Sequence, residues 1–477
     1  MKHEKHFEAR RAFLRRSAHL SMAGVAAPWA LNLAAIGEAA AFTATDYKAL
    51  VCVFLYGGND YGNTLVPVDN VNYDKYATIR GGGAGRTAGG IALAQSDLAA
   101  TTLTPAAGSP LPANGATYAL HPAMTNLKAL WDAGHAAVQL NVGPLVIPMT
   151  KAQYASSNRV ANPLPPKLFS HNDQQSVWQS SSPEGSTIGW GGNLGDLALS
   201  GNGEAVFTCI SATGNAVFLS GDTALPYNVS TSGAVAINGV KNSVYGSTAV
   251  RDALSTLLQQ TRTQTLEEEY ARVVRRAISS EAKVSAALSG VTLATAFPSG
   301  NSLADQLKVV ARLIGARSSL GAKRQVFLVS LGGFDLHDNL IAQHPVLLGR
   351  VSAALSAFYA ATAELGVADK VTAFTASDFG RTLASNGDGA DHGWGSHHFV
   401  VGGAVRGQRY YGTAPPVEVG GNNDVGQGRL LPTTSVDQYA ATLAKWFGAS
   451  ATELAQVVPN IGRFGGAGYP VDLDFLA

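Results

Sequence analysis

The hydrophobic residues of the chain fall into short, almost continuous apolar runs that alternate with longer stretches of mixed polarity. An uninterrupted run of this length suits a strand that is covered on both faces, as in a parallel sheet. We therefore predict buried strands at residues 49–56, 136–142, 325–330, 371–375 and 399–401.

Helical patterns separate these runs. Apolar residues recur at three- and four-residue spacing within 121–134, 265–279, 303–314, 344–365 and 435–448. A further helix is predicted to start after Ser170, because serine is a favoured N-cap. Strands that alternate with helices predict a doubly wound, mainly parallel α/β sheet between helix layers, with a helical insertion at about 200–318. In such folds ligands bind beyond the carboxyl ends of the strands.

The first 41 residues resemble an export signal rather than part of this fold. Arg10 and Arg11 precede Ala-Phe-Leu, a mildly apolar segment follows over 17–36, and small residues end it at 38–41. This is the pattern of a twin-arginine signal, which directs export of folded protein. A membrane anchor would need about 20 strongly apolar residues. We predict a single α/β domain over 42–477, working in the periplasm or outside the cell after passage through the twin-arginine translocase.

Composition and charge narrow the class of protein further. The chain is 46% hydrophobic and 14% charged with 53 glycines, as expected of a soluble globular protein with many turns. Its 34 basic and 33 acidic residues give a net charge of only +1, which argues against a nucleic-acid partner. No stretch after residue 41 predicts a stable membrane span. Cys52 and Cys209 lie in apolar runs, which favours two buried free thiols, although an exported protein could also form a disulfide.

Polar motifs cluster just after the predicted strands. Five of the eight histidines beyond residue 41 lie within them. Carboxylates and imidazoles gathered from several strand ends suit a divalent ion such as Zn²⁺, Mn²⁺, Mg²⁺ or Ca²⁺. A serine at a helix start could attack an anionic ester there. The segments are Gly57–Asp60, 170–173, 335–337, 377–381 and 391–398.

Each motif also has a purely structural interpretation. Asp60 could cap a tight turn, Ser170 could cap a helix, and Asp378 could form an ion pair with Arg381. Asp335 and His337 could simply share a hydrogen bond. On a strand, His397 and His398 point in opposite directions, so at most one should face a site. His121 and His344 precede prolines and are expected to be local caps.

The motifs taken together resemble a bacterial family, domain of unknown function 1501, over nearly the whole of residues 42–477. The resemblance includes Gly332-Gly333-Phe334-Asp335-Leu336-His337, Ser377-Asp378-Phe379-Gly380-Arg381 and Asp391-His392-Gly393-Trp394-Gly395. It extends to the tail at 434–439, 446–447 and 459–461. That family is similar to the alkaline phosphatase-like superfamily of phosphatases and sulfatases, which implies the corresponding α/β fold.

The resemblance also implies roles for individual residues. Ser170 would be the nucleophile, with His171 beside it, and Arg381 an oxyanion clamp, a task that suits its planar fork of donors. The implied metal ligands are Asp60, Asp335, His337, Asp378 and either His392 or His397.

Two departures from the superfamily pattern affect this expectation. Phe379 follows Asp378 where two-metal phosphatases carry a histidine, and the motif Cys/Ser-x-Pro-x-Arg of ordinary sulfatases is absent from the sequence. We therefore expect an exported, metal-dependent hydrolase of phosphate or sulfate esters, whose substrate is a small anionic ester or a cell-envelope component. The alternative is a catalytically silent superfamily member that acts as a cell-envelope binding or assembly factor.

Overall fold

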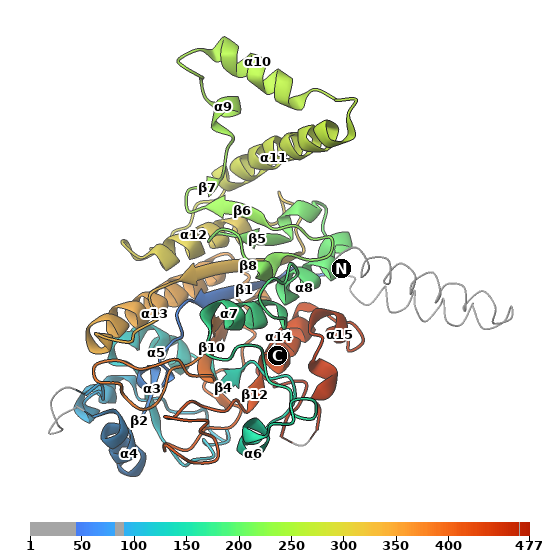
Figure 1. Ribbon diagram of the computed structural model, residues 1–477. Helices are drawn as coiled ribbons and strands as arrows, with labels where there is room; N and C mark the ends of the chain where they lie inside the picture. Colours follow the sequence, from blue (N-terminus) through green and yellow to red (C-terminus); the bar gives the residue numbers. More distant parts are fainter. Residues whose placement is uncertain (1–43, 82–89, 467) are drawn as a thin grey trace.

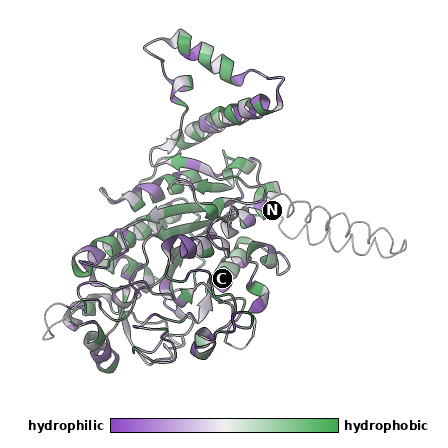
Figure 2. Ribbon diagram, in the orientation of Figure 1, coloured by the Kyte–Doolittle hydropathy of each residue, from purple (hydrophilic) through white to green (hydrophobic). Residues whose placement is uncertain are grey.

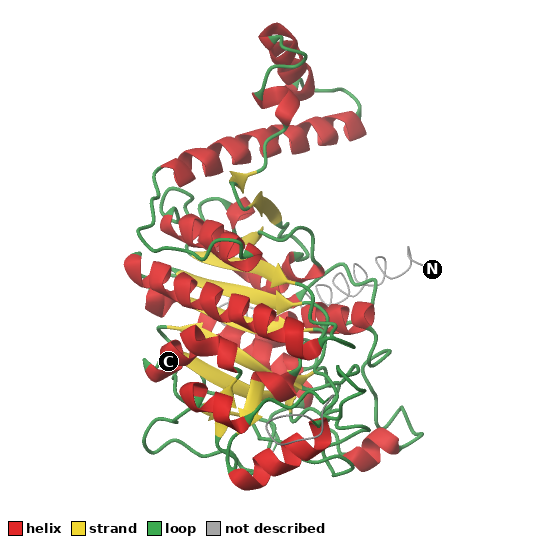
Figure 3. Cartoon of the chain, turned by 90° about the vertical axis from the view of Figure 1, so that its left-hand side faces the viewer, coloured by secondary structure: helices red, strands yellow, loops and turns green. Residues whose placement is uncertain are grey.

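A central sheet organises the molecule, seen in a computed structural model that describes residues 44–81, 90–466 and 468–477. The predicted export signal of residues 1–41 lies outside this part of the chain. Within the described residues the sheet has ten strands in the order β11-β4-β10-β9-β1-β8-β5-β6-β7, with β12 also paired to β4. Helices cover both faces of the sheet (Figures 1 and 3). The predicted doubly wound, mainly parallel α/β class is confirmed.

The five predicted strands are all present and form the middle of the sheet. They extend the predicted runs by one to three residues at one or both ends. Their bounds are β1 Lys48–Leu55, β4 Ala136–Gly143, β8 Arg324–Leu331, β9 Val371–Ser377 and β10 Ser396–Gly402. The short strands are β5 Cys209–Ser211, β6 Tyr227–Ser230, β7 Gly233–Ala234, β11 Tyr410–Tyr411 and β12 Thr434–Ser435, while β2 Leu65–Pro67 and β3 Tyr118–Leu120 pair separately.

The directions of the strands decide which of the connecting loops lie at the same edge of the sheet. β1 runs parallel to β8 and to β9, and Leu55, the last residue of β1, is level with Leu331 and with Ser377. β10 runs antiparallel to both β9 and β4. The loops that follow β1 and β8 and the loop that joins β9 to β10 therefore lie at one edge of the sheet.

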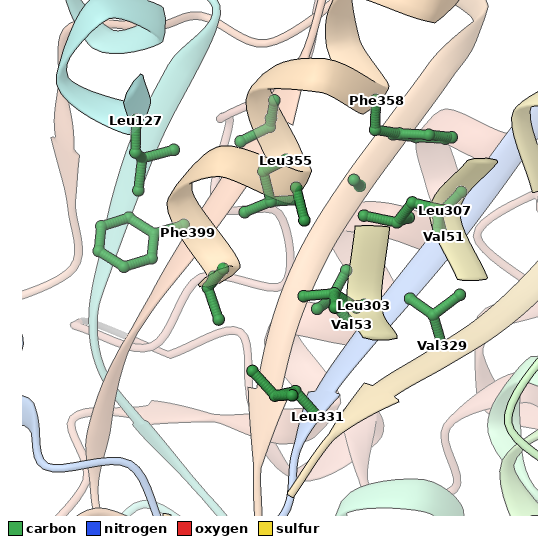
Figure 4. Close-up of a cluster of buried hydrophobic side chains, with 14 of the residues drawn as sticks. Val51, Val53, Leu127, Leu303, Leu307, Val329, Leu331, Leu355, Phe358 and Phe399 are labelled. Atoms are coloured by element: carbon green, nitrogen blue, oxygen red, sulfur yellow. The ribbon is translucent and has the colours of Figure 1, made fainter. Parts of the chain in front are cut away.

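Each face of the sheet has its own hydrophobic core, because side chains alternate along every strand. On β1, Val51 and Val53 belong to one core, with helices α5 and α12–α13 (Figure 4). Leu50, Cys52 and Phe54 belong to the other, with α8, α14 and α15. Cys52 and Cys209 are both buried and free, as favoured from the sequence. Two-sided burial accounts for the continuous apolar runs that predicted these strands.

Four of the five helices predicted from apolar spacing begin and end within four residues of the predicted bounds, whereas the helix predicted at 265–279 continues ten residues further, to Ser289. The helices on the first face are α5 Thr125–Asp132, α12 Ser302–Gly315 and α13 Leu340–Glu364. Those on the second are α7 His171–Ser180, α8 Trp190–Ala198, α14 Val436–Phe447 and α15 Leu454–Val457. Three further helices, α3 Tyr61–Thr64, α4 Asn70–Arg80 and α6 Lys151–Ala155, lie in the loops near the carboxyl edge. Ser170 is the N-cap residue of α7, as predicted, although its side chain makes no capping hydrogen bond.

One helix of the described residues is long and apolar enough to cross a membrane, by length and composition alone. It is α13, with a mean hydropathy of 1.4 over its most apolar window, half of which is buried inside the protein. Leu348, Val351, Leu355 and Phe358 of this helix are part of the first core. The apolar character of α13 is thus that of a core helix.

The region predicted as an insertion, about 200–318, divides into two parts. β5 and β6 extend the central sheet, and α12 packs in the first core. The remaining helices are α9 Asn238–Lys241, α10 Thr248–Gln259 and α11 Thr265–Ser289. They form an arm that projects from the sheet edge beyond β6 and β7 (Figures 1 and 3).

Candidate metal centre

The carboxyl edge of the sheet brings four segments together. The loops after β1 and β8 contribute Gly57 and Asp335, the loop that joins β9 to β10 contributes both Asp378 and His392, and the first turn of α7 contributes His171. The turn after β1 is packed tightly against its neighbours. Gly57 adopts a φ of +116°, and a Cβ atom there would collide with the backbone of Asp335. A glycine is required where two loops approach this closely.

Three side chains at this edge converge in the manner of metal ligands. His171, Asp335 and His392 each offer one ligand atom, and these atoms all lie within 4.8 Å of one another. Nε2 of His171 is 3.4 Å from Oδ2 of Asp335, and Nε2 of His392 is 3.2 Å from Oδ1. Two imidazoles and one carboxylate are a ligand set suited to Zn²⁺ and similar divalent ions.

Both histidines are oriented by hydrogen bonds through their other ring nitrogen. Nδ1 of His171 lies 2.6 Å from Oδ2 of the fully buried Asp378. The same Oδ2 accepts hydrogen bonds from Gln175 and from the backbone N–H of Gly57. Nδ1 of His392 lies 2.7 Å from the carbonyl oxygen of Phe169, which can only accept. A proton on each Nδ1 leaves the Nε2 lone pair for a metal.

The buried environment of His171 supports this interpretation. Its Nε2 is buried and has no hydrogen-bond partner among the described residues. A polar atom in that state costs free energy unless a ligand satisfies it. A divalent ion placed between Nε2 and the Asp335 carboxylate would satisfy it. The residues at this edge therefore fit one bound metal ion.

The charges of the site perturb several pKa values. The hydrogen bond to Asp378 raises the pKa of His171, although partial burial acts in the opposite direction. Burial would raise the pKa of Asp335, but the hydrogen bond and positive charge of Arg381 lower it overall. Burial lowers the pKa of His392. Asp335 is thus ionised and His392 neutral at neutral pH, the states that a metal requires, while a metal at His171 would compete with the proton that its raised pKa favours.

His337 stands at the exposed side of the same group. Its Nδ1 lies 3.1 Å from Oδ1 of Asp391, and its Nε2 lies 2.9 Å from Nε2 of His392. Nε2 of His337 is also 3.1 Å from Oδ1 of Asp335. Two imidazole nitrogens this close need a shared proton or a shared cation between them. His337 can therefore act as a further metal ligand, or it can donate a proton to the group formed by His171, Asp335 and His392.

Two residues expected as ligands lie elsewhere in the structure. Asp60 forms a buried ion pair with Arg80, at 2.5 Å, with both side chains almost fully inaccessible. His397 is buried on β10, where its Nδ1 accepts the backbone N–H of Asn141 and its ring packs on Tyr61. Burial lowers the pKa of His397 to about 3. Asp60 is therefore the buried counterion of Arg80, and His397 is a residue of the core.

The predicted ligand Asp378 supports the site without belonging to the convergent group of three. Its Oδ2 accepts three hydrogen bonds, and the other oxygen, Oδ1, is buried with no hydrogen-bond partner among the described residues. The neighbouring Phe379 is buried, and its ring centroid lies 4.8 Å from that of His171 and 4.6 Å from that of His392. An apolar ring therefore fills the position next to the three ligands.

Ser170 and Arg381 both lie at the site, where the Ser170 hydroxyl and both terminal nitrogens of Arg381 have protein partners, whereas the buried Nε of Arg381 has no partner among the described residues. The Ser170 hydroxyl donates to Asp173 at 2.8 Å. Arg381 is fully buried and donates to Asp335 at 2.7 Å and to the carbonyl oxygens of Gly57 and Ala390. The guanidinium of Arg381 thus holds the Asp335 carboxylate and two loops, and it is not free to clamp a substrate oxyanion.

Sequence reasoning missed a second arginine beside the site. Arg429 donates from Nε to the carbonyl oxygen of His392 at 2.7 Å, and its guanidinium lies 5.2 Å from the ring centre of Phe169. Both contacts are to segments that position the ligand histidines. Its side chain is half-buried, and its Nη2 has no hydrogen-bond acceptor within the described ranges. No motif surrounds Arg429 in the sequence, so only the fold reveals its position.

Comparison with solved structures gives weak matches. They include PsFucS1 sulfatase from Pseudoalteromonas sp., at 10% identity and a TM-score of 0.35, covering 95% of this chain and 76% of that one. The lipoteichoic acid synthase LtaP from Listeria monocytogenes matches at 10% identity and a TM-score of 0.32, covering 86% and 74%. None of the curated proteins matches the chain.

A protein-family match is much more extensive. It spans residues 47–458, from the start of β1 to the end of α15, and includes every residue of the candidate metal centre. Over this span the chain matches the family described as "Protein of unknown function (DUF1501)", and it belongs to that family.

Proposed function

We propose that this protein is an exported hydrolase that uses one divalent metal ion to cleave phosphate or sulfate esters. The observation that carries the proposal is the convergence of His171, Asp335 and His392 at the carboxyl edge of the sheet. Active sites of open α/β folds lie at this edge. Export by the twin-arginine translocase, from the pattern in residues 1–41, is part of the same proposal.

The protein groups have separate tasks in this proposal. His171, Asp335 and His392 would hold the metal, and Asp378 and the Phe169 carbonyl keep the histidines in the required tautomer. When bound, a divalent ion polarises the ester oxygens and lowers the energy of the charged transition state. Arg381 fixes the Asp335 carboxylate from behind. Arg429 supplies the positive charge that faces the ester anion.

The proposal is tested with phosphomonoester, phosphodiester and sulfate ester substrates, each assayed with Zn²⁺, Mn²⁺, Mg²⁺ and Ca²⁺. At least one combination should show turnover, and Ser170→Ala should abolish it while metal binding and folding are retained. The reason is that this serine precedes His171 at the start of α7, where free backbone N–H groups stabilise an anion. His135→Ala is a control for the metal dependence, because this histidine stacks on Tyr359.

Two results would contradict parts of this proposal. Unchanged turnover in Ser170→Ala would exclude serine as the nucleophile and leave water as the attacking group. No turnover with any ester, in protein that binds metal, would favour the second candidate function, a binding or assembly factor of the cell envelope. Phe379 favours that candidate, because it stands where two-metal phosphatases carry a ligand and packs against both ligand histidines.

Replacing Arg429 with Gln is expected to lower kcat/KM for the best ester about 100-fold, as for the loss of one donor to a developing oxyanion. Metal content should stay unchanged, because Arg429 contacts the backbone carbonyl of His392 and the ring of Phe169, and not the imidazole of either candidate ligand histidine. Arg463→Gln is the matched control, since this side chain is exposed and donates to the carbonyl oxygen of Val146. Equal activities of the Arg429 and Arg463 variants would remove Arg429 from the proposed site.

A further inference from the structure

The arm formed by α9, α10 and α11 leaves two helices with little to pack against. α10, all of which the structure describes, has no buried residue. In the outer half of α11 only Ala271 and Val274 are buried, whereas Ser280, Val284 and Leu288 are covered where the helix meets the body. A short helix pair that buries so little of its own surface is unfavourable unless another surface covers it.

The exposed side of α11 carries an apolar stripe. Leu266 is 85% exposed, Tyr270 64% and Val273 42%, and the exposed Ala277 follows four residues later. The spacing of four, three and four residues places all of these side chains on one face of the helix. The same spacing forms the seam of a coiled coil. Along the arm in Figure 2, hydrophobic residues alternate with hydrophilic ones, in contrast to the mostly hydrophobic central strands.

Two apolar grooves adjoin this stripe. The tip groove has a volume of about 510 Å³ and includes Leu257, Leu266 and Tyr270. The root groove, between α11 and the body, has about 540 Å³ and includes Leu225, Val273 and Ala277. Leu225 is itself 57% exposed, so it adds apolar surface to the root groove. The stripe therefore continues from one groove into the other.

The charges on α11 indicate what covers the stripe. Glu267, Glu268 and Glu269 stand at the outer end, and Arg272, Arg275 and Arg276 follow one to two turns later. A second α11 laid antiparallel places acidic residues against basic ones, whereas a parallel copy places like charges together. Glu267 and Arg276 are exposed, and neither has an ion-pair partner in the described part of the chain.

We propose that the arm is a homodimerisation element, in which α11 of one copy pairs antiparallel with α11 of a second copy. The two-fold axis passes between Ala271 and Arg272. Leu266 then lies opposite Ala277 of the other copy, and Tyr270 lies opposite Val273. The tip of each arm enters the root groove of the other, so the same surface patch is used twice, as a two-fold interface requires. This inference does not depend on the proposed hydrolase activity.

Light scattering after size exclusion, on the full chain at micromolar concentration, tests the proposal. The wild type should be a dimer, and Leu266→Glu combined with Tyr270→Glu should weaken dimerisation at least 100-fold, giving a monomer. Both side chains are exposed, so the variant keeps its fold. Leu111→Glu is the matched control: Leu111 is 74% exposed, lies outside the arm, and its replacement should leave the dimer intact.

Cysteine crosslinking then tests the orientation. The two native cysteines are buried and do not interfere. A mixture of the single variants Leu266→Cys and Ala277→Cys should form a mixed disulfide dimer under mild oxidation, and Leu266→Cys alone should not crosslink. Crosslinking of Leu266→Cys to itself would overturn the antiparallel arrangement.

Other occupants of the stripe give different outcomes. A monomeric wild type would overturn the proposal. If that monomer sediments with vesicles of phosphatidylethanolamine and phosphatidylglycerol, and the Leu266→Glu/Tyr270→Glu variant does not, the stripe contacts lipid instead. A monomer that does not sediment with the vesicles would point to a different protein partner. That result would equally overturn homodimerisation.

Discussion

Asp335→Asn is expected to lower the affinity for the divalent ion about 100-fold or more and to reduce ester turnover with it. Asp335 is the only carboxylate of the three convergent ligands, so the variant removes the negative charge that offsets the metal. The pKa of Asp335 is lowered by Arg381, so the carboxylate is ionised across the neutral range. Isothermal titration with Zn²⁺ and Mn²⁺ measures the affinity directly.

The design of this variant separates metal loss from unfolding. The Asn side chain keeps an oxygen that accepts the hydrogen bond from Arg381, which Ala would not. Asp338→Asn, three residues later and exposed, is the matched control and should bind metal as the wild type does. Equal metal affinities of the Asp335 and Asp338 variants would place the ion elsewhere and remove the basis of the proposed hydrolase.

The main elements of the fold could be predicted from the sequence because two-sided burial leaves a clear pattern. β1 supplies apolar side chains to both cores, so its run is uninterrupted, and the run predicted the strand almost to the residue. The direction of β10 was not predictable in the same way. Parallel and antiparallel central strands have similar sequences, and it is the antiparallel pairing of β10 with β9 that shows that the chain enters β10 at the carboxyl edge.

The segments of the site were predictable, but the partner of each side chain was not. Asp335, His337 and His392 stand in motifs after strand ends, and the topology brings those ends to one edge. Hydrogen bonds then decide the roles. Arg381 was expected to face a substrate, but its donors hold Asp335 and two loops, and Arg429 carries no local signal.

The role of His344, a structural residue, could also not be predicted from its neighbours in the sequence. The proline after it suggested a local cap, yet the residue lies inside α13 and is fully buried. Its Nε2 lies 3.0 Å from Oδ1 of Asn59, in the turn after β1. Burial holds its pKa well below the usual value, so the ring is neutral. A long-range contact of this kind, 285 residues apart, leaves no trace in local sequence.

Arg80→Met is expected to lower the free energy of unfolding by about 3–5 kcal/mol, because it leaves the buried Asp60 carboxylate without its counterion. The two side chains are 0% and 1% exposed, and Nη2 of Arg80 lies 2.5 Å from Oδ2 of Asp60. Urea denaturation at neutral pH, with an unchanged m-value, measures the loss. Lys445→Met, which breaks the surface ion pair with Asp472, is the control and should cost about 0–1 kcal/mol.

The double variant Asp60→Asn/Arg80→Met separates the two roles considered for Asp60. Removing both charges together should restore most of the lost stability, since neither partner is then left charged and unpaired. If Asp60 serves the fold rather than the metal, this variant binds the divalent ion within about threefold of the wild type, whereas Asp335→Asn does not. A stable double variant without metal affinity would show that Asp60 is a metal ligand. The loop after β1 would then have to rearrange when the ion binds.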